Sequence, residues 1–356
     1  MTYHPIESQQ RSALSDALGG FAQVPENWMS ATAVHPLFYD DPSQIWLRFH
    51  GSNYGLLPSP SGYHFIDFIG EKGRQLETAW VQAMLPEAPR VCQDPREVRS
   101  AGKVEETWDL ISRGVPAVVQ PALWWAPEQL YGVPDLIVHS EWLVEQFPDL
   151  LPDAAPAHYV VIDFKFTSNL GENTADGRAY AAQVRTYSYM LGHLQGTMPV
   201  RGFLVPRDRL FNPLPITVHS QLGRPLDQDI AEMRDRFLKI KLEGHRSTPW
   251  TDPAMASNPK HSDDYWNAAK HTIAWDRVDG VDPCVLPWIT PKQRGQLASM
   301  GFHSLRDLLA VPAEDVPLER CDNLGAARCR SLRTILQAAR SRVPIPPSPL
   351  LVPALT

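Results

Sequence analysis

One segment constrains the fold of this chain more than any other: residues 158–167, with the sequence HYVVIDFKFT. β-Branched and aromatic side chains at this density are typical of a central β-strand. Because side chains alternate between the two faces of a strand, Asp163 and Lys165 share one face while Ile162 and Phe164 share the other. An isolated charge is costly to bury in such an apolar run. For this segment alone, the simpler explanation is an ion pair on a partly solvated face.

Asp135 is a second acidic residue in an apolar segment, residues 131–139, which forms another predicted strand. If the two strands are neighbours, Asp135 and Asp163 repel each other. Like charges ~4 Å apart cost about 4 kcal/mol at an effective dielectric constant of ~20, so the pair needs a proton or a cation. Oxygen ligands alone favour Mg²⁺ or Mn²⁺ over zinc.

Two predicted helices supply further polar candidates. The apolar residues of segment 71–85 recur at helical spacing and predict a helix that carries Glu77. On its own, Glu77 is better explained as a solvent-facing helix residue. A second helix follows the glycine-containing segment 170–177 and carries Gln183 and Tyr187, which share a face because they are four residues apart. Packing in the core explains Tyr187 nearly as well as contact with a substrate.

Four short motifs together resemble the PD-(D/E)XK nuclease superfamily, and most closely its RecB-like exonuclease branch. In chain order they are Gly73-Arg-Gln-Leu-Glu77, Gly132-Val-Pro-Asp135, Ile162-Asp-Phe-Lys165 and Gln183-Val-Arg-Thr-Tyr187. Their order and their predicted elements agree with that family over residues 63 to 205. One difference is that many RecB-like proteins place a metal-binding histidine on the first helix, whereas His64 lies thirteen residues before Glu77.

The resemblance implies an α/β fold with a restriction-endonuclease-like core, a central mixed β-sheet flanked by helices. It also implies that Asp135 and Asp163 bind Mg²⁺ or Mn²⁺ directly and that Glu77 binds the ion directly or through water. The backbone carbonyl of Phe164 would complete the shell. Such an ion lowers the pKa of its bound water and neutralises the charge that develops on a phosphate.

The same resemblance implies roles for the remaining motif residues. Lys165 would stabilise or position the attacking water. Gln183 and Tyr187 would contact the substrate backbone or brace Lys165. The expected protein is a metal-dependent deoxyribonuclease, a phosphodiester hydrolase of DNA repair, recombination or the processing of phage or foreign DNA. The alternative is a non-catalytic nucleic-acid-binding or scaffold protein that retains the nuclease fold.

The segment 283–342 is basic, with nine Lys and Arg against five Asp and Glu in a chain of net charge −7. Phosphate binding is driven by such local charge, which makes DNA the expected partner. The segment Thr290-Pro-Lys-Gln293 predicts a capped helix start, Gly301 can end that helix, and Ser304 opens another.

This part resembles tandem helix-hairpin-helix domains, which offer backbone N–H groups at a helix N-terminus to DNA phosphates. By that resemblance Gly325 would contact nucleic acid, and Arg328, Arg330 and Arg333 would add positive charge. A small all-α module that packs on the nuclease or on a partner protein is an equally good explanation. Any helicase partner would be a separate chain, because this one lacks a Walker-type phosphate loop.

The chain is predicted to divide into a nuclease-like domain with an N-terminal extension over residues 1–265, a helical domain over 283–342 and a proline-rich tail over 343–356. A chain of 356 residues usually needs more than one core. No segment approaches the ~18 apolar residues of a membrane span, and the first residues lack a basic region followed by an apolar one. A cytoplasmic protein without membrane contact is expected.

The four cysteines are too few and too scattered for a disulfide framework. They are Cys92, Cys284, Cys321 and Cys329, and no two of them have the two-residue separation that is usual in metal clusters. Buried reduced thiols are therefore expected. An iron-sulfur nuclease that uses the C-terminal cysteines is the alternative.

Overall fold

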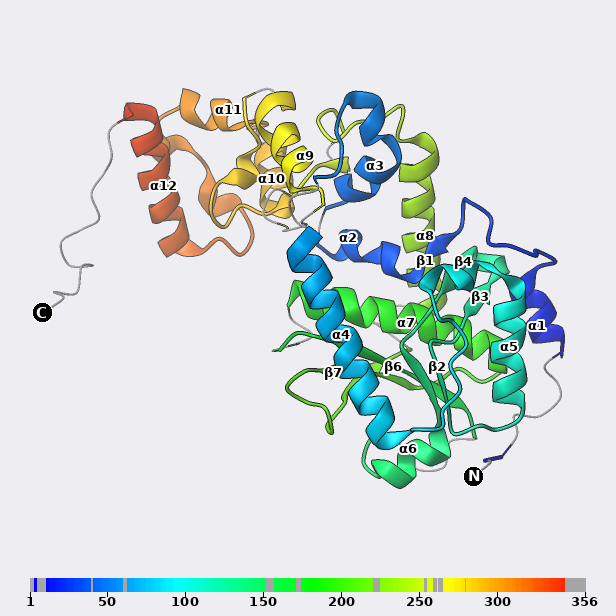
Figure 1. Ribbon diagram of the computed structural model, residues 1–356. Coiled ribbons are helices and arrows are strands. Elements are labelled where there is room, and N and C mark those ends of the chain that lie inside the picture. Colours follow the sequence, from blue (N-terminus) through cyan, green and yellow to red (C-terminus); the bar gives the residue numbers. More distant parts are fainter. Residues whose placement is uncertain are drawn as a thin grey trace, which may run out of the picture. The chain divides into compact units, whose positions relative to one another are not determined.

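The chain folds into two compact units (Figure 1). The computed structural model describes residues 3–4, 11–39, 41–59, 63–151, 157–168, 170, 174–219, 225–252, 255–258, 261, 265–278 and 280–342. The first unit comprises Met1–Tyr39 and Gly62–Glu243, and the second comprises Asp40–Ser61 and Gly244–Thr356. Residues 40–61 and 244–265, which the sequence assigned to the nuclease-like domain, thus group with the second unit. The expected tail, 343–356, lies outside the described residues.

The first unit is built on a mixed five-stranded sheet. Its strands are, in spatial order, β2 (Ala117–Val119), β5 (Leu136–His139), β6 (Tyr159–Lys165), β7 (Arg201–Pro206) and β8 (Leu214–Thr217). The pair β6 and β7 is parallel and the other pairs are antiparallel. Leu136 is paired with Ile162, so the same register places Asp135 opposite Asp163 on neighbouring strands.

Helices cover both faces of this sheet (Figure 1). On one face, Ile162 and Phe164 pack with Trp80 of α4 (Tyr63–Met84) and Trp142 of α6 (Ser140–Gln146). On the other face lies α7 (Ala175–Gln195), which contacts β6 and β7. The contact of α7 with β7 is close at Gly202, where an added Cβ would lie 2.5 Å from a side-chain atom of α7. The α/β class and the flanking helices are confirmed.

The segment 131–139 was expected to form one continuous strand. It instead contributes to two strands that belong to different sheets. Its first part is β4 (Leu130–Gly132), which joins β1 (Met29–Ser30) and β3 (Leu123–Trp125) in a three-stranded sheet. Its second part is β5. Between them stands Pro134, which has no N–H group for a strand ladder. Asp135 therefore lies at the point where the chain passes from one sheet to the other.

The first unit contains further helices. They are α1 (Arg11–Leu18), η1 (Ala31–Val34), α2 (His35–Phe38), η4 (Pro95–Arg99), α5 (Ala101–Ser112), η5 (Ala126–Glu128) and α8 (Leu226–Glu243). The 3-10 turn η4 and the helix α5 are separate elements, because Ser100 takes an extended conformation between them.

The described part of the second unit is helical throughout. Its elements are α3 (Ser43–His50), η2 (Gly51–Tyr54), α9 (Asn267–Thr272), a π-helical turn (Ile273–Arg277), η8 (Pro283–Val285), α10 (Pro291–Ser299), α11 (Leu305–Ala310), η9 (Ala313–Asp315), η10 (Leu318–Arg320) and α12 (Gly325–Ser341). The expected capped start at Thr290 is present as a capping box, and the helix expected to open at Ser304 also begins with one. Within residues 249–282, α9 and the π-helical turn bury Ala269, Ile273 and Ala274 at helical spacing.

A buried ionic cluster joins the two chain segments of the second unit. The carboxylate of Asp41 accepts hydrogen bonds from the Nζ of Lys270 at 3.0 Å, the backbone N–H of Asn258 at 3.1 Å and the hydroxyl of Ser43 at 2.5 Å, and lies 3.0 Å from the Nδ1 of His261. Asp41 and Lys270 are almost fully buried. This cluster explains why residues 40–61 belong with the C-terminal half of the chain.

Candidate active site

Two acidic side chains of the first unit meet around one amide group. Glu77 lies on α4 and is buried, with 6% of its surface exposed. The Nε2 of Gln120, the residue that follows β2, donates to Glu77 Oε1 and Oε2 at 3.1 Å each and to Asp135 Oδ1 at 3.1 Å. The carboxylates of α4 and of the β5 strand are thus brought together.

Asp135 and Asp163 are joined to the same site through β6. The second oxygen of Asp135, Oδ2, accepts a hydrogen bond of 2.7 Å from the backbone N–H of Phe164. Asp163 Oδ2 forms an ion pair with the Nζ of Lys165 at 2.5 Å. This buried oxygen has no hydrogen-bonding partner of suitable geometry among the described residues. The Nζ also lies over the ring of Tyr180, 5.0 Å from its centre.

The site holds more negative charge than its surroundings easily accommodate. Burial raises the pKa of Asp163 to about 7, with repulsion from Asp135 acting in the same direction and Lys165 opposing it. Burial and the charge of Asp135 also raise the pKa of Glu77, against the effects of Gln120 and Arg90. A proton or a cation therefore stabilises the cluster.

Lys165 stays charged in this environment. Burial would by itself lower the pKa of its amine, but the neighbouring charges of Asp163 and Asp135 outweigh burial and raise it. The amine is thus a hydrogen-bond donor rather than a base. A donor beside Asp163 and Asp135 suits the positioning of a water or of an anionic oxygen.

Gln183 and Tyr187 are buried and bonded to each other on α7. The Nε2 of Gln183 donates to the hydroxyl of Tyr187 at 2.9 Å, and the Oε1 of Gln183 lies 3.0 Å from the Nε2 of His35. Tyr187 packs on Gly132, where an added Cβ would lie 2.5 Å from its ring. Burial, and then the charge of Asp163, raise the pKa of Tyr187 well above its usual value. This arrangement suits bracing of the site.

Three residues at the site were not found from the sequence: Gln120, Arg90 and His35. The guanidinium of Arg90 lies 3.1 Å from Glu77 Oε1 and is about one-third exposed. None of the three belongs to a recognisable motif. The one signal for Gln120 was a polar residue directly after an apolar strand, a pattern that many surface residues share.

The chemistry of the site fits a hard divalent cation. The donors are carboxylate oxygens, which hard cations prefer, and burial raises the pKa of both Glu77 and Asp163, so a positive charge at the site stabilises their ionised forms. Within that part of the chain, however, no group of three or more His, Cys, Asp or Glu side chains is already arranged to hold an ion. The Gln120 amide stands between Glu77 and Asp135, and Lys165 is paired with Asp163. The carbonyl of Phe164 as a further ligand stays a prediction.

The residues expected to contact nucleic acid lie on α12. Gly325 is its first residue, with a φ of 63°, and Arg328 and Arg330 are exposed. Arg333 differs from them, because its guanidinium forms a bidentate ion pair with Glu319 and also donates to two backbone carbonyls of segment 313–316. Arg333 is thus held within the second unit.

All four cysteines are free and buried. Cys284, Cys321 and Cys329 belong to the apolar core around α10, α11 and α12. Burial raises the pKa of the Cys321 and Cys329 thiols. Cys321 and Cys329 are therefore protonated members of a packed core at neutral pH.

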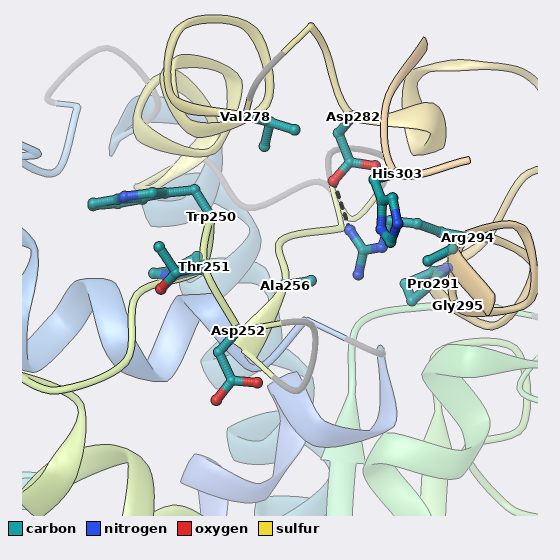
Figure 2. Close-up of a pocket in the computed structure, with 12 residues that line it drawn as sticks. Trp250, Thr251, Asp252, Ala256, Val278, Asp282, Pro291, Arg294, Gly295 and His303 are labelled. Carbon is teal, nitrogen blue, oxygen red and sulfur yellow. Dashed lines mark hydrogen bonds and ion pairs between the residues drawn. The ribbon is translucent and has the colours of Figure 1, made fainter. Parts of the chain in front are cut away.

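The second unit contains a cavity of about 240 Å³, shown in Figure 2. Trp250, Asp282, Arg294 and His303 are among its lining residues. An ion pair of 2.6 Å joins Arg294 to Asp282, and Arg294 also donates to the carbonyl of Ser257 at 2.8 Å. The cavity includes none of the predicted site residues, and Arg294 and Asp282 of its lining are paired with each other.

Fold and site together define an α/β protein with a mixed sheet, in which the buried Glu77 of α4 is joined through Gln120 to the partly buried Asp135, and Asp135 lies opposite the ion pair of Asp163 with Lys165 on β6. Comparison of the chain with protein-family models, with curated proteins and with solved structures finds no match. Its function is therefore inferred from the site itself. No helix within the described ranges is long and apolar enough to cross a membrane.

Proposed function

We propose that this protein is a metal-dependent deoxyribonuclease of the PD-(D/E)XK type. The observation that carries the proposal is that Gln120 joins Glu77 to Asp135, while Asp163 and Lys165 form an ion pair on the neighbouring strand opposite Asp135. The four side chains match the order of that superfamily's motifs. Buried acidic groups with perturbed pKa values, here Glu77 and Asp163, are typical of a catalytic site.

Asp135 and Asp163 would hold Mg²⁺ or Mn²⁺, with Glu77 as a third ligand directly or through water. When bound, the ion supplies a water of lowered pKa and neutralises the charge that develops on the scissile phosphate. Lys165 donates a hydrogen bond to the attacking water or to a phosphate oxygen. Gln183 and Tyr187 are bonded to each other on α7, which packs on β6. They hold this part of α7 in place and so help to fix the position of Asp163.

In this proposal, the basic segment 283–342 binds the phosphate backbone of DNA. Arg328 and Arg330 are exposed in the first two turns of α12, where positive side chains add to the backbone N–H groups of the helix N-terminus. Contacts of this kind hold the phosphate backbone without reading bases. Arg333 is bound to Glu319 and is not part of this surface.

Cleavage of linear and closed circular DNA, with single- and double-stranded substrates, tests the proposal in Mg²⁺, Mn²⁺ and EDTA. We expect cleavage that requires a divalent cation and falls at least about a hundredfold in the Asp163→Asn and Lys165→Met variants. Asp208→Asn and Lys239→Met are matched controls, because both residues are exposed in the same unit. Native cleavage rates in the site variants would overturn the assignment.

The alternative is a non-catalytic nucleic-acid-binding protein with the same fold. The observation that favours it is that the described residues contain no group of three acids already arranged for an ion. Gel shifts run beside the cleavage assay separate the two functions. Shifted but uncut DNA with every cation would support the alternative and exclude the nuclease.

A further inference from the structure

Gln120 holds the two acidic side chains of the site together. Its amide nitrogen donates to Glu77 Oε1 and Oε2 and to Asp135 Oδ1, all at 3.1 Å. The orientation of the amide is fixed by this environment, because an Oε1 in the same place would face three carboxylate oxygens. One neutral side chain thus serves two carboxylates that otherwise repel each other.

The backbone of Gln120 is also unusual. Its φ is 48°, in the left-handed region that glycine and asparagine adopt more readily than glutamine. Both backbone groups are bonded in this conformation: the N–H donates to the carbonyl of Asp135 at 2.9 Å, and the carbonyl accepts from Cys92 at 3.1 Å. Gln120 is therefore tied to Asp135 through both its backbone and its side chain, and a strained conformation directs its amide to the carboxylates.

A cation and an amide N–H group cannot both occupy the space between the same carboxylate oxygens, since both are positive. The N–H group supplies only a partial charge, whereas Mg²⁺ or Mn²⁺ supplies two full charges. The amide therefore satisfies the carboxylates less completely than an ion does. An ion that enters between Glu77 and Asp135 must first break the hydrogen bonds to Gln120.

We propose that Gln120 is a positioning residue that takes the place of the cation in the metal-free protein and is displaced when a divalent cation binds. The inference rests on the proposed function, because it assumes that Glu77 and Asp135 are metal ligands. Its role is to keep the two carboxylates together before the ion arrives, at the expense of affinity for the ion. By linkage, removal of the amide destabilises the metal-free state and strengthens metal binding.

Substitution of Gln120 by glycine tests this role without adding backbone strain, because glycine readily adopts a positive φ. Gln129→Gly is a matched control. Gln129 also has a positive φ, 55°, and its side chain makes no bond to Glu77 or Asp135. Gln120→Asn is a second variant that tolerates the backbone conformation, and its shorter side chain places the amide away from the two carboxylates.

Binding of Mn²⁺ is measured by titration calorimetry and by the electron paramagnetic resonance signal of the free ion. Thermal unfolding is measured in EDTA and in Mn²⁺. We expect Gln120→Gly and Gln120→Asn to bind Mn²⁺ about tenfold more tightly than the native protein. Their Tm should be lower in EDTA and should rise more on addition of Mn²⁺, whereas Gln129→Gly should bind Mn²⁺ as the native protein does.

The outcomes separate this inference from the proposed function. If the native protein binds Mn²⁺ and both Gln120 variants bind it equally or more weakly, the proposal that the ion displaces Gln120 is wrong, but the proposed metal site is still supported. A native protein that binds no Mn²⁺ in either measurement would overturn both the metal site and the role of Gln120.

Discussion

Asp135, the residue before β5, lies opposite Asp163 of β6 in the register of these two strands, and the backbone N–H of Phe164 holds Asp135 in place through a hydrogen bond of 2.7 Å. Two acidic side chains in this position repel each other, and Lys165 compensates only one of them directly. The relationship between these residues links the fold to the proposed chemistry, because strand pairing alone brings the two carboxylates together.

Stability without metal should fall as pH rises, because the carboxyl group of Asp163 binds its proton more tightly in the folded state. Burial raises its pKa to about 7, whereas an unfolded Asp titrates near ~3.9. Ionisation of Asp163 therefore costs folding free energy between about pH 4 and pH 7, up to about 4 kcal/mol. Asp135, Lys165, Tyr180 and Tyr187 are titratable groups that interact with it.

Urea unfolding in EDTA at a series of pH values measures this effect. Asp163→Asn should flatten the decline between pH 4 and pH 7, while the exposed control Asp208→Asn should leave it unchanged. The prediction fails if native stability rises steadily over that interval with the same slope as in Asp163→Asn.

The sequence predicted the parts of the site that depend on local patterns. The dense β-branched and aromatic run before Asp163 predicts β6 and the face of Lys165, and helical spacing predicts α4 and α7. It could not predict Gln120 or Arg90, because their contacts with Glu77 span 43 and 13 residues and have no local signature. The break at Pro134 was also missed, since the apolar residues around it resemble one strand.

The domain boundary also could not be predicted, because it depends on a contact between residues that are distant in the sequence. Residues 40–61 have no local pattern that links them to the C-terminal half of the chain. The link is made by Asp41, whose partner Lys270 lies 229 residues further along the chain. A long-range ion pair of this kind becomes visible only in the fold.

Trp80 should be needed to hold α4, and therefore Glu77, against the sheet. Its ring packs on Phe164, with ring centres 5.3 Å apart, and its Nε1 donates to the carbonyl of Leu210 at 2.7 Å. Trp80→Phe removes this hydrogen bond and leaves a cavity, so we expect a loss of about 2–4 kcal/mol in urea unfolding. Phe68→Leu on the same helix is the control, because Phe68 is 51% exposed. Equal effects of both substitutions would contradict this role of Trp80.

Gly114 should be required for the docking of the N-terminal segment. Its φ is 66°, and an added Cβ would lie 2.4 Å from the carbonyl oxygen of Tyr3, whose N–H bonds to the carbonyl of Gly114. Gly114→Ala should therefore displace Tyr3 from His139, on which its ring stacks. Gly20→Ala separates this clash from backbone strain, because Gly20 has a φ of 77° and no neighbour within 4 Å of an added Cβ.

We expect Gly114→Ala to cost about 1–3 kcal/mol more than Gly20→Ala in urea unfolding. Limited proteolysis should also cut the N-terminal segment faster in Gly114→Ala. Matching stability and cleavage rates in the two variants would show that the contact with Tyr3 adds nothing to the fold.

Asp41→Asn should strongly destabilise the second unit. Burial raises the pKa of Asp41, but hydrogen bonding from His261 and the charge of Lys270 outweigh burial and lower it below the usual value. The ion pair thus stabilises the fold above about pH 4, and this contribution is lost as pH falls further. At neutral pH the substitution leaves the charge of Lys270 buried without its partner, at a cost of about 3–5 kcal/mol.

A double-mutant cycle with Lys270→Met measures this coupling in urea unfolding. We expect the double variant to be more stable than Asp41→Asn alone, because it no longer buries an unpaired charge. The exposed Asp276→Asn is the control for loss of a carboxylate in the same unit. Additive effects of the two single substitutions would exclude the coupling.

Arginines of α12 should divide into a DNA-binding pair and a structural residue. Arg328 and Arg330 are exposed, whereas Arg333 is bound to Glu319. Because each phosphate contact on duplex DNA contributes about 0.9 to the slope of log K against log salt concentration, Arg328→Ala with Arg330→Ala should reduce that slope by about 2. Arg333→Ala should leave the slope unchanged and lower stability instead, since two backbone carbonyls lose their donor.

Fluorescence anisotropy with labelled duplex DNA over a range of salt concentrations, in EDTA to prevent cleavage, measures these slopes. Lys239→Met is the control for loss of an exposed positive charge elsewhere in the chain. If the double variant and this control bind DNA with the same slope as the native protein, the N-terminal end of α12 does not contact phosphates. This result would favour the alternative explanation of segment 283–342, in which it is an all-α module that packs on the nuclease or on a partner protein.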